Sequence, residues 1–202
     1  MSEWSAVVPV RGWTMGKSRL GIPGVARAMA LDTASALRGC AQIGEVLVVS
    51  GDPEVRRDME HIGCTVVEES SAGSLNGAIA MAAERRSHEG CIVVLGDLPA
   101  LRPADVALAL QRSTREPCFI ADAQGTGSTI WMTRSGRVET HFGERSRARH
   151  RFHGVIELAR LPEEDPEAWA RLRRDVDDGV DLSDAERLGL GTHTSAAIAD
   201  RT

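Results

Sequence analysis

Short apolar runs alternate with longer segments of helical period through the first 121 residues of the chain. The apolar runs are rich in β-branched residues and most of them stop at glycine, proline or aspartate, which is typical of buried strands. The longer segments carry apolar residues three or four positions apart, as Ala30, Ala34 and Leu37 do, which is typical of helices. The expected strands are Ala6–Val10, Glu45–Ser50, Thr65–Val67, Cys91–Leu95 and Cys118–Ala121, and the expected helices are Val25–Arg38, Pro53–Ile62, Ser74–Arg86 and Pro103–Arg112.

This alternation predicts an α/β fold with a mainly parallel sheet and helices on both faces. After Asp122 the pattern weakens, and a turn-rich stretch at Gly125–Thr129 leads into a short apolar run. Further on, we expect Leu172–Val176 to form a last strand and Leu182–Leu188 a last helix. The small, polar tail from residue 191 to 202 is expected to fray. No repeat or linker divides the sequence, so a single domain over residues 1–202 is expected.

Composition and charge exclude several classes of protein. Of the 202 residues, 42% are hydrophobic and 26% are charged, which is typical of a globular domain and not of a disordered chain. No apolar run reaches the roughly 18–20 residues of a membrane-spanning helix, and the N-terminus lacks the features of a signal peptide. A net charge of −5 argues against nucleic acid as a partner, because binding phosphates requires a basic surface. We therefore expect a cytoplasmic protein that acts on neither membranes nor nucleic acid.

The first candidate site is the loop Gly12–Ser18, directly after the first strand. It ends in Gly-Lys-Ser as a P-loop does, but only three residues separate Gly12 from Gly16, and Pro23 interrupts the helix that a P-loop requires. Lys17 is the only lysine among 24 basic residues, so a compact ammonium is retained here in an arginine-rich chain. A loop that binds phosphates in another nucleotide-binding fold fits these features, and a plain surface loop is the alternative.

Aspartates form the second candidate site. Asp97 follows a buried strand, at the edge of the sheet where ligands of open α/β folds bind. Asp175 and Asp177 would project from the same face of the expected last strand. Carboxylates held so close repel one another unless a cation neutralises them, and Mg²⁺ prefers carboxylates together with substrate phosphates. The alternatives are a turn or capping aspartate at position 97 and an acidic turn before the last helix.

A third candidate is an anion site at Phe142–Ser146. Ser146 is expected to cap a helix, and four arginines lie between residues 145 and 151. A helix N-terminus with a hydroxyl and a nearby glycine amide binds anions. The alternative is a solvated arginine-rich face, with His150 as a structural hydrogen-bonding group.

Six motifs follow one another over nearly all of residues 6–190. They are Val8–Arg11 with Lys17–Leu20, Ser74–Ala78, Asp97–Pro99, Gly125–Thr129, Phe142–Gly143 with Ser146 and His150, and Arg174–Asp177 with Asp181–Leu182. The ordered set resembles one family, the guanylyltransferases that activate a phosphorylated three-carbon acid in biosynthesis of the deazaflavin coenzyme F420. The chain departs from the family pattern at Arg11, where lysine is frequent, and at Ser128, where threonine or asparagine is frequent.

The resemblance implies a fold similar to the nucleotide-diphospho-sugar transferases and a set of site residues. GTP would bind over the first loop, at Arg11, Gly16, Lys17, Leu75 and Asn76. Mg²⁺ would bind to Asp97, Asp175 and Asp177, with Asp97 and Lys17 as catalytic groups. The phosphorylated acid would bind to the backbones of Thr129 and Gly143 and to the Ser146 hydroxyl.

The chemistry of such a transfer agrees with the residues present. An acceptor phosphate is already largely deprotonated near neutral pH and needs no general base, so the protein has only to align two anions and neutralise their charge. Phosphoenolpyruvate is the expected acid, with 2-phospho-L-lactate and then 3-phosphoglycerate as alternatives. A molybdenum-cofactor or sugar-phosphate nucleotidyltransferase on a similar fold is a related alternative, although such enzymes usually have a longer glycine-rich loop than Gly12–Lys17. A GTP-binding module without turnover is the alternative from another functional class. No heptad pattern indicates an oligomeric state, which stays open.

Overall fold

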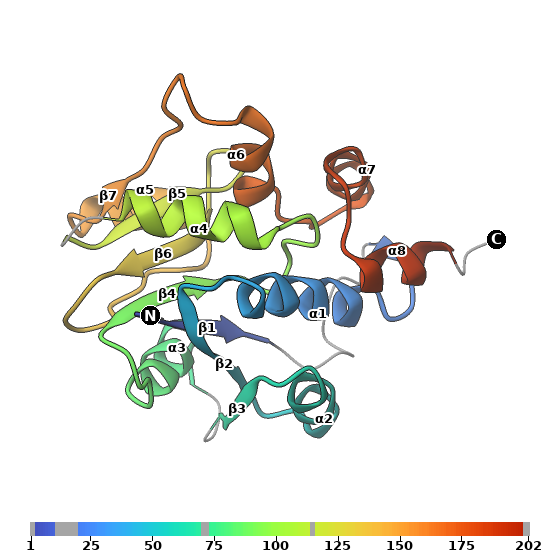
Figure 1. Ribbon diagram of the computed structural model, residues 1–202, viewed down its shortest axis with the longest axis horizontal. Coiled ribbons are helices and arrows are strands. Elements are labelled where there is room, and N and C mark those ends of the chain that lie inside the picture. The colour runs from blue at the N-terminus through green and yellow to red at the C-terminus, as the bar shows by residue number, and fades with distance from the viewer. Residues whose placement is uncertain (1–2, 11–19, 70–72, 114–115, 200–202) are drawn as a thin grey trace.

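The computed structural model describes residues 3–10, 20–69, 73–113 and 116–199, which form a seven-stranded sheet with helices packed around it (Figure 1). The strands are β1 (Trp4–Pro9), β2 (Ile43–Ser50), β3 (Thr65–Glu68), β4 (Gly90–Val94), β5 (Cys118–Ala121), β6 (Ser128–Thr133) and β7 (Ile156–Glu157). The helices are α1 (Val25–Arg38), α2 (Pro53–His61), α3 (Leu75–Ala83), α4 (Pro103–Arg112), α5 (Ser146–Phe152), α6 (Pro166–Arg173), α7 (Gly179–Leu188) and α8 (Thr192–Ala199).

The sheet has the strand order β3-β2-β1-β4-β6-β5-β7. Four neighbouring pairs are parallel, and β6 alone runs antiparallel to both of its neighbours. The expected mainly parallel sheet is therefore confirmed, with one reversed strand. β6 is reversed because the turn after β5 returns the chain directly beside it, where a parallel strand would need a long crossover. As a result, the start of β6 lies beside the carboxyl end of β4, and the Leu95 N–H donates to the Thr129 carbonyl over 3.0 Å.

Alternating residues along the strands fill two separate hydrophobic cores. On one face, Val8 and Val94 pack with the apolar sides of α1, α2, α4 and α6. On the other face, Val7 and Val93 pack with α3 and with apolar residues between 138 and 155. The expectation of helices on both faces is confirmed.

The expected strand at Leu172–Val176 is wrong, because α6 occupies Pro166–Arg173 and a loop follows it. Asp165 caps this helix by accepting a hydrogen bond from the Glu167 N–H over 2.9 Å, and proline stands at its first position. Trp169 and Leu172, three residues apart, pack into the first core. The helical period of this segment therefore decides its structure, and Asp175 and Asp177 lie in a loop.

The tail is also better ordered than expected, because Thr192–Ala199 forms α8, which packs beside α1 (Figure 1). The buried carboxylate of Asp32 in α1 accepts hydrogen bonds from the backbone N–H groups of His193 and Thr194, over 3.0 and 2.7 Å. Capping by a residue distant in the chain thus fixes the start of α8. Within the residues described, no helix has the length and apolar character to cross a membrane.

A buried ion pair joins α4 to α6. The Arg171 guanidinium donates to both carboxylate oxygens of Asp105 over 2.8 Å, and both side chains are almost fully buried. We expect Asp105→Ala to lower the free energy of unfolding by about 3–5 kcal/mol, because Arg171 loses the buried carboxylate to which it donates and α4 loses the side chain of its capping box. Urea denaturation measures the loss.

Arg137→Ala provides the control, since the Arg137–Glu139 pair is exposed and an exposed pair contributes about 1 kcal/mol or less. Equal stability changes in the two variants would contradict the structural role of the buried pair.

Candidate active site

A backbone hydrogen bond joins the two aspartate segments of the site. Asp97 lies in the loop after β4, and its carbonyl accepts from the Val176 N–H over 3.1 Å. Val176 is buried and stands between Asp175 and Asp177. The structure therefore brings the predicted aspartates together although 78 positions separate Asp97 from Asp175 in the sequence.

The carboxylates influence one another electrostatically. Burial raises the pKa of Asp175 to about 7, and the negative charges of Asp97, Asp122 and Asp177 contribute to the increase. A site that gathers carboxylates in this way suits a cation, and carboxylate oxygens are hard donors of the kind Mg²⁺ prefers. Among the residues that the structure describes, no group of three or more His, Cys, Asp or Glu side chains is placed so that together they could hold a metal ion. The donor chemistry fits a divalent cation, and the assignment of its ligands stays a prediction.

The acidic segment divides into residues that cap α7 and residues that face the site. Asp178 and Asp181 form a capping box at the start of α7, with hydrogen bonds of 2.8 and 3.1 Å from the Val180 and Asp181 N–H groups to Asp178. The Asp181 carboxylate also accepts from the Asp177 N–H over 3.1 Å. The interpretation as an acidic turn is therefore correct for Asp178 and Asp181, and those two hold the loop that carries Asp175.

Asp122 is a residue of the site that our sequence analysis missed. Its buried carboxylate accepts hydrogen bonds from the Thr126 and Gly127 N–H groups, over 2.9 and 2.6 Å. A Cβ atom at Gly127 would collide with the Asp122 Oδ2 atom, so the close approach requires glycine. An aspartate followed by glycines is a recognised turn pattern, and this signal could have identified Asp122.

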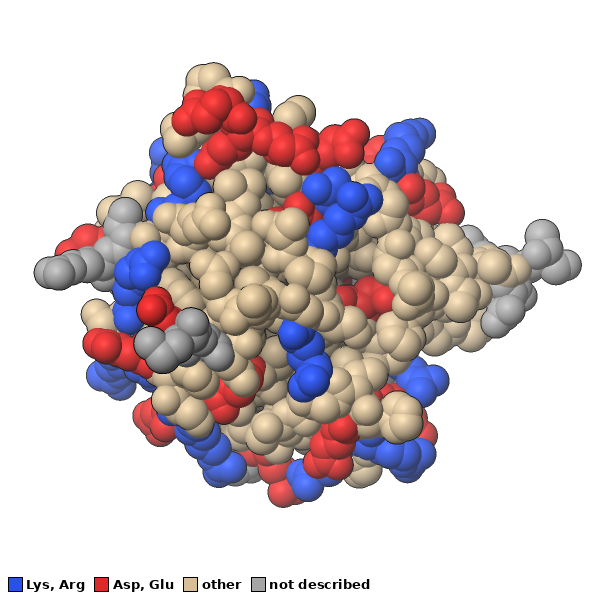
Figure 2. Space-filling model, viewed as in Figure 1, with Lys and Arg blue, Asp and Glu red and all other residues tan. Residues whose placement is uncertain are grey.

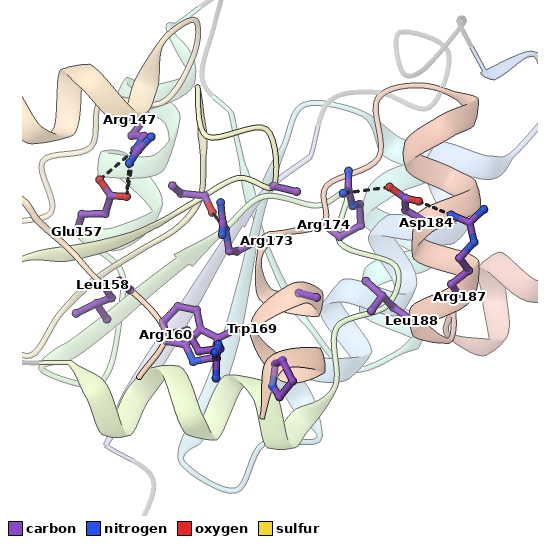
Figure 3. A pocket seen from close by; sticks show the side chains of 15 residues that line it. Arg147, Glu157, Leu158, Arg160, Trp169, Arg173, Arg174, Asp184, Arg187 and Leu188 are labelled. Atoms are coloured by element: carbon purple, nitrogen blue, oxygen red, sulfur yellow. Dashed lines mark hydrogen bonds and ion pairs between the residues drawn. The ribbon is translucent and has the colours of Figure 1, made fainter. Parts of the chain in front are cut away.

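Arg173 lines a cavity of about 580 Å³ and also holds this turn (Figure 3). Its guanidinium donates to the Ala121 and Asp122 carbonyls, with a shortest distance of 2.7 Å. Other arginines of this cavity already have partners: Arg147 pairs with Glu157, and Arg174 pairs with Asp184. On the face seen in Figure 2, acidic and basic side chains are interspersed.

The predicted acid-binding residues lie close together beside the start of β6. The Ser146 N–H donates to the Gly143 carbonyl over 3.1 Å, and the Ser128 hydroxyl donates to the Ser146 Oγ atom over 2.8 Å. The Thr129 hydroxyl points the other way and donates to the Leu172 carbonyl of α6 over 2.7 Å. β6 therefore connects these residues to the helix that precedes the aspartate loop.

The expectation that Ser146 caps a helix is wrong. Arg145 is the N-cap of α5, in a left-handed conformation with φ of 55° and no side-chain capping bond. Ser146 is the first residue of the helix and its side chain is buried. Its hydroxyl contacts Ser128 instead of the helix N–H groups.

Asn76, which we predicted to contact a nucleoside, holds the loop at Phe142 by hydrogen bonds. Ser74 caps α3 through a 3.1 Å hydrogen bond from the Gly77 N–H, which leaves Leu75 and Asn76 in the first helical turn. The Asn76 Oδ1 atom accepts from the Phe142 N–H and the Thr140 hydroxyl, each over 2.8 Å, and its Nδ2 atom donates to the Phe142 carbonyl over 3.0 Å. Contact of Leu75 and Asn76 with a nucleoside stays a prediction. Arg11, Gly16 and Lys17 lie outside the described residues.

The sequence relationships are consistent with this arrangement. The family model of the MobA-like NTP transferase domain matches residues 11–156. The chain belongs to the MobA-like NTP transferase family. Two proteins named phosphoenolpyruvate guanylyltransferase, from Streptomyces avermitilis and Streptomyces coelicolor, are each 39% identical to it. The alignments cover 98% of this chain and 94% and 96% of the two relatives.

Solved structures support the same fold. A putative nucleotide-diphospho-sugar transferase from Desulfovibrio desulfuricans superimposes with a TM-score of 0.67 at 15% identity, covering 99% of this chain and 95% of that protein. A nucleotidyl transferase from Methanothermobacter thermautotroptrophicus gives 0.60 at 17% identity, with 92% and 97% covered. The expected nucleotide-diphospho-sugar transferase fold is therefore confirmed. The match of the MobA-like domain ends before Asp175 and Asp177, which the full-length relatives cover.

His150 gives this MobA-like NTP transferase a dependence of stability on pH. Burial, with the nearby charges of His141, Arg149 and His153, lowers the pKa of His150 from 6.5 to about 4. His150 therefore takes up a proton near pH 6.5 in the unfolded chain, but only near pH 4 in the folded protein. We expect stability to fall as the pH drops through this window, by roughly 3 kcal/mol in all from this group.

Urea denaturation at several pH values checks this contribution, with His150→Asn as the variant that lacks the titrating group. The wild-type protein should lose stability more steeply than the variant between pH 6.5 and about 4. Parallel pH profiles would show that His150 does not supply the difference.

Proposed function

We propose that the protein is a phosphoenolpyruvate guanylyltransferase. It transfers GMP from GTP to the phosphate of phosphoenolpyruvate and releases pyrophosphate, giving enolpyruvyl-diphospho-guanosine for coenzyme F420 biosynthesis. Full-length identity of 39% to proteins of that name is the observation that carries this proposal. The nearness of Asp97, Asp175 and Asp177 to one another supports it, because nucleotidyl transfer brings two anionic substrates together.

The reaction is an in-line displacement at phosphorus. An oxygen of the acceptor phosphate forms a bond to the α-phosphorus of GTP. The bond from that phosphorus to the oxygen that bridges the α- and β-phosphates breaks. Pyrophosphate leaves with the electron pair. Because a phosphate monoester has a second pKa of about 6, the attacking oxygen needs no general base. The protein contributes alignment and charge neutralisation.

The proposed roles follow the chemistry of each group. Asp97, Asp175 and Asp177 would hold Mg²⁺, which when bound supplies positive charge to the phosphate oxygens. Thr129 and Gly143 would bind the phosphorylated acid through their backbones and Ser146 through its hydroxyl. Arg11, Gly16 and Lys17 would bind the GTP phosphates, and Leu75 and Asn76 would lie near the nucleoside. We further propose a single nucleotidyltransferase domain and a cytoplasmic location.

Pyrophosphate release tests the assignment. The protein is incubated with GTP and Mg²⁺ together with phosphoenolpyruvate, 2-phospho-L-lactate, 3-phosphoglycerate or no acceptor. We expect release only when an acceptor is present, with the highest kcat/KM for phosphoenolpyruvate. A higher kcat/KM for 2-phospho-L-lactate would reassign the acid. We expect the two kcat/KM values to differ only modestly, because the two acids differ by two hydrogens. GTP binding without release in any sample would favour a binding module.

Asp97→Ala tests the contribution of the aspartates. We expect kcat/KM for pyrophosphate release to fall by at least about 100-fold, because a charge arranged for the transition state is lost. Glu186→Ala, which removes an exposed carboxylate from α7, is the control and should retain wild-type turnover. Near-wild-type turnover of a folded Asp97→Ala protein would overturn the metal assignment.

A further inference from the structure

We propose that His150 is the positioning residue of the acceptor site. As a neutral imidazole with its proton on Nδ1, it orders the loop that carries Gly143 and, through Ser128, directs the Ser146 hydroxyl proton toward the acceptor's anionic oxygens. This inference rests on the proposed function and identifies which group prepares the site for its anionic substrate.

The imidazole packs against two aromatic rings. His150 is fully buried. Its ring lies 5.1 Å from the Phe119 ring and 5.2 Å from the Phe142 ring, with the second pair edge to face at 85°. Because these contacts fix the plane of the ring, each nitrogen faces one partner.

The partner of Nε2 decides the tautomer. The His141 backbone N–H donates to the His150 Nε2 atom over 2.9 Å. A backbone N–H is always a donor, so Nε2 carries no proton, and the proton of the neutral ring is on Nδ1. The Nδ1 atom lies 3.0 Å from the Ser128 Oγ atom and donates to it.

The hydrogen bond from His150 to Ser128 also sets the direction of the next hydrogen bond, from Ser128 to Ser146. Ser128 accepts from His150, so its own proton is available for the 2.8 Å hydrogen bond to the Ser146 Oγ atom. Ser146 is thereby an acceptor toward Ser128 and keeps its proton for another partner. Within the described part of the chain, no hydrogen bond uses that proton. A phosphate or carboxylate oxygen only accepts hydrogen bonds when ionised, so the arrangement matches an anionic ligand.

The same imidazole holds the other side of the site. His141, which donates to Nε2, stands two residues before Gly143. Gly143 has a φ of 116°, which side-chain-bearing residues rarely adopt, and its carbonyl accepts from the Ser146 N–H over 3.1 Å. His150 therefore reaches the Gly143 loop through one nitrogen and Ser146 through the other.

A bulge in β6 makes this contact possible. Ile120 of β5 pairs with Ile130. The next residue of β5, Ala121, pairs with Ser128 and not with Thr129, so the register shifts by one residue. A shift of one residue moves a side chain to the opposite face of the sheet. Ser128 consequently faces α5 and His150, whereas Ile130 packs in the core beneath α6.

Two substitutions separate the functions of the two nitrogens. In His150→Asn the amide N–H can replace Nδ1 as the donor to Ser128, and in His150→Gln the amide oxygen can replace Nε2 as the acceptor from His141. Ser128→Ala breaks the chain without changing the histidine. Phe152→Ala, on the same helix and 86% exposed, is the control and should behave as wild type.

Steady-state kinetics with GTP and phosphoenolpyruvate give the decisive comparison. We expect Ser128→Ala and His150→Gln to raise KM for phosphoenolpyruvate by about 10-fold, the effect of one charge-assisted hydrogen bond, with KM for GTP within about twofold of wild type. In a Ser146→Ala background, Ser128→Ala should have almost no further effect, because its action passes through Ser146. Equal increases in both KM values, or additive effects of the two serine substitutions, would overturn the proposal.

A measurement that needs no turnover separates this inference from the proposed function. Long-range ¹H–¹⁵N NMR of the wild-type protein reports which nitrogen of His150 carries the proton, and we expect Nδ1. Calorimetry of phosphoenolpyruvate binding should show weaker binding by Ser128→Ala. If wild type binds phosphoenolpyruvate but releases no pyrophosphate with any acceptor, the proposed function fails, while these two results still decide the role of His150. An Nε2–H tautomer, or unchanged binding, would overturn it.

Discussion

The hydrogen bond from the Val176 N–H to the Asp97 carbonyl is the contact on which the site depends. Carboxylates repel one another, so their own charges would not bring Asp97 and Asp175 together. The backbone does so instead, since Val176 is buried and its amide is fixed against the loop after β4. The buried Asp105–Arg171 pair anchors α6 and thereby the start of this loop. Neutral backbone contacts and a buried ion pair hold the like charges near one another.

The reversed strand β6 joins the aspartate side of the site to the acid-binding side. Thr129 contacts α6 through its hydroxyl, and its neighbour Ser128 contacts α5 through the bulge. The turn before β6, fixed by Asp122, brings both residues to the carboxyl end of β4. A parallel strand at this place would start at the opposite edge of the sheet. One antiparallel strand in a mainly parallel sheet therefore explains how the two halves meet.

Parts of the chain with strong local patterns were predictable, and parts decided by distant partners were not. The strands before residue 122 and the helices between them follow from their apolar period, and the expected helix α1 has the bounds Val25–Arg38. The tail forms α8 because Asp32 of α1 caps it, and no local pattern in the sequence indicates this contact. Ser146 was expected at a helix cap because serine favours that position, but its burial against Ser128 prevailed. At Leu172–Val176 the expected strand does not form, because the helical period from Pro166, together with packing of α6 against α4, continues the helix to Arg173, and a loop follows.

The sequence by itself determined the fold class and the family, because both follow from local periods and ordered motifs, and it predicted where functional groups occur. Only the tertiary structure decided how those groups face one another. It separated Asp178 and Asp181, which cap α7, from Asp175 and Asp177. It also gave Asn76 and His150 their partners at Phe142, His141 and Ser128. The physical reason is that hydrogen bonds and electrostatic interactions act over a few ångströms in space, whereas the residues that share them here are up to 162 positions apart in the chain.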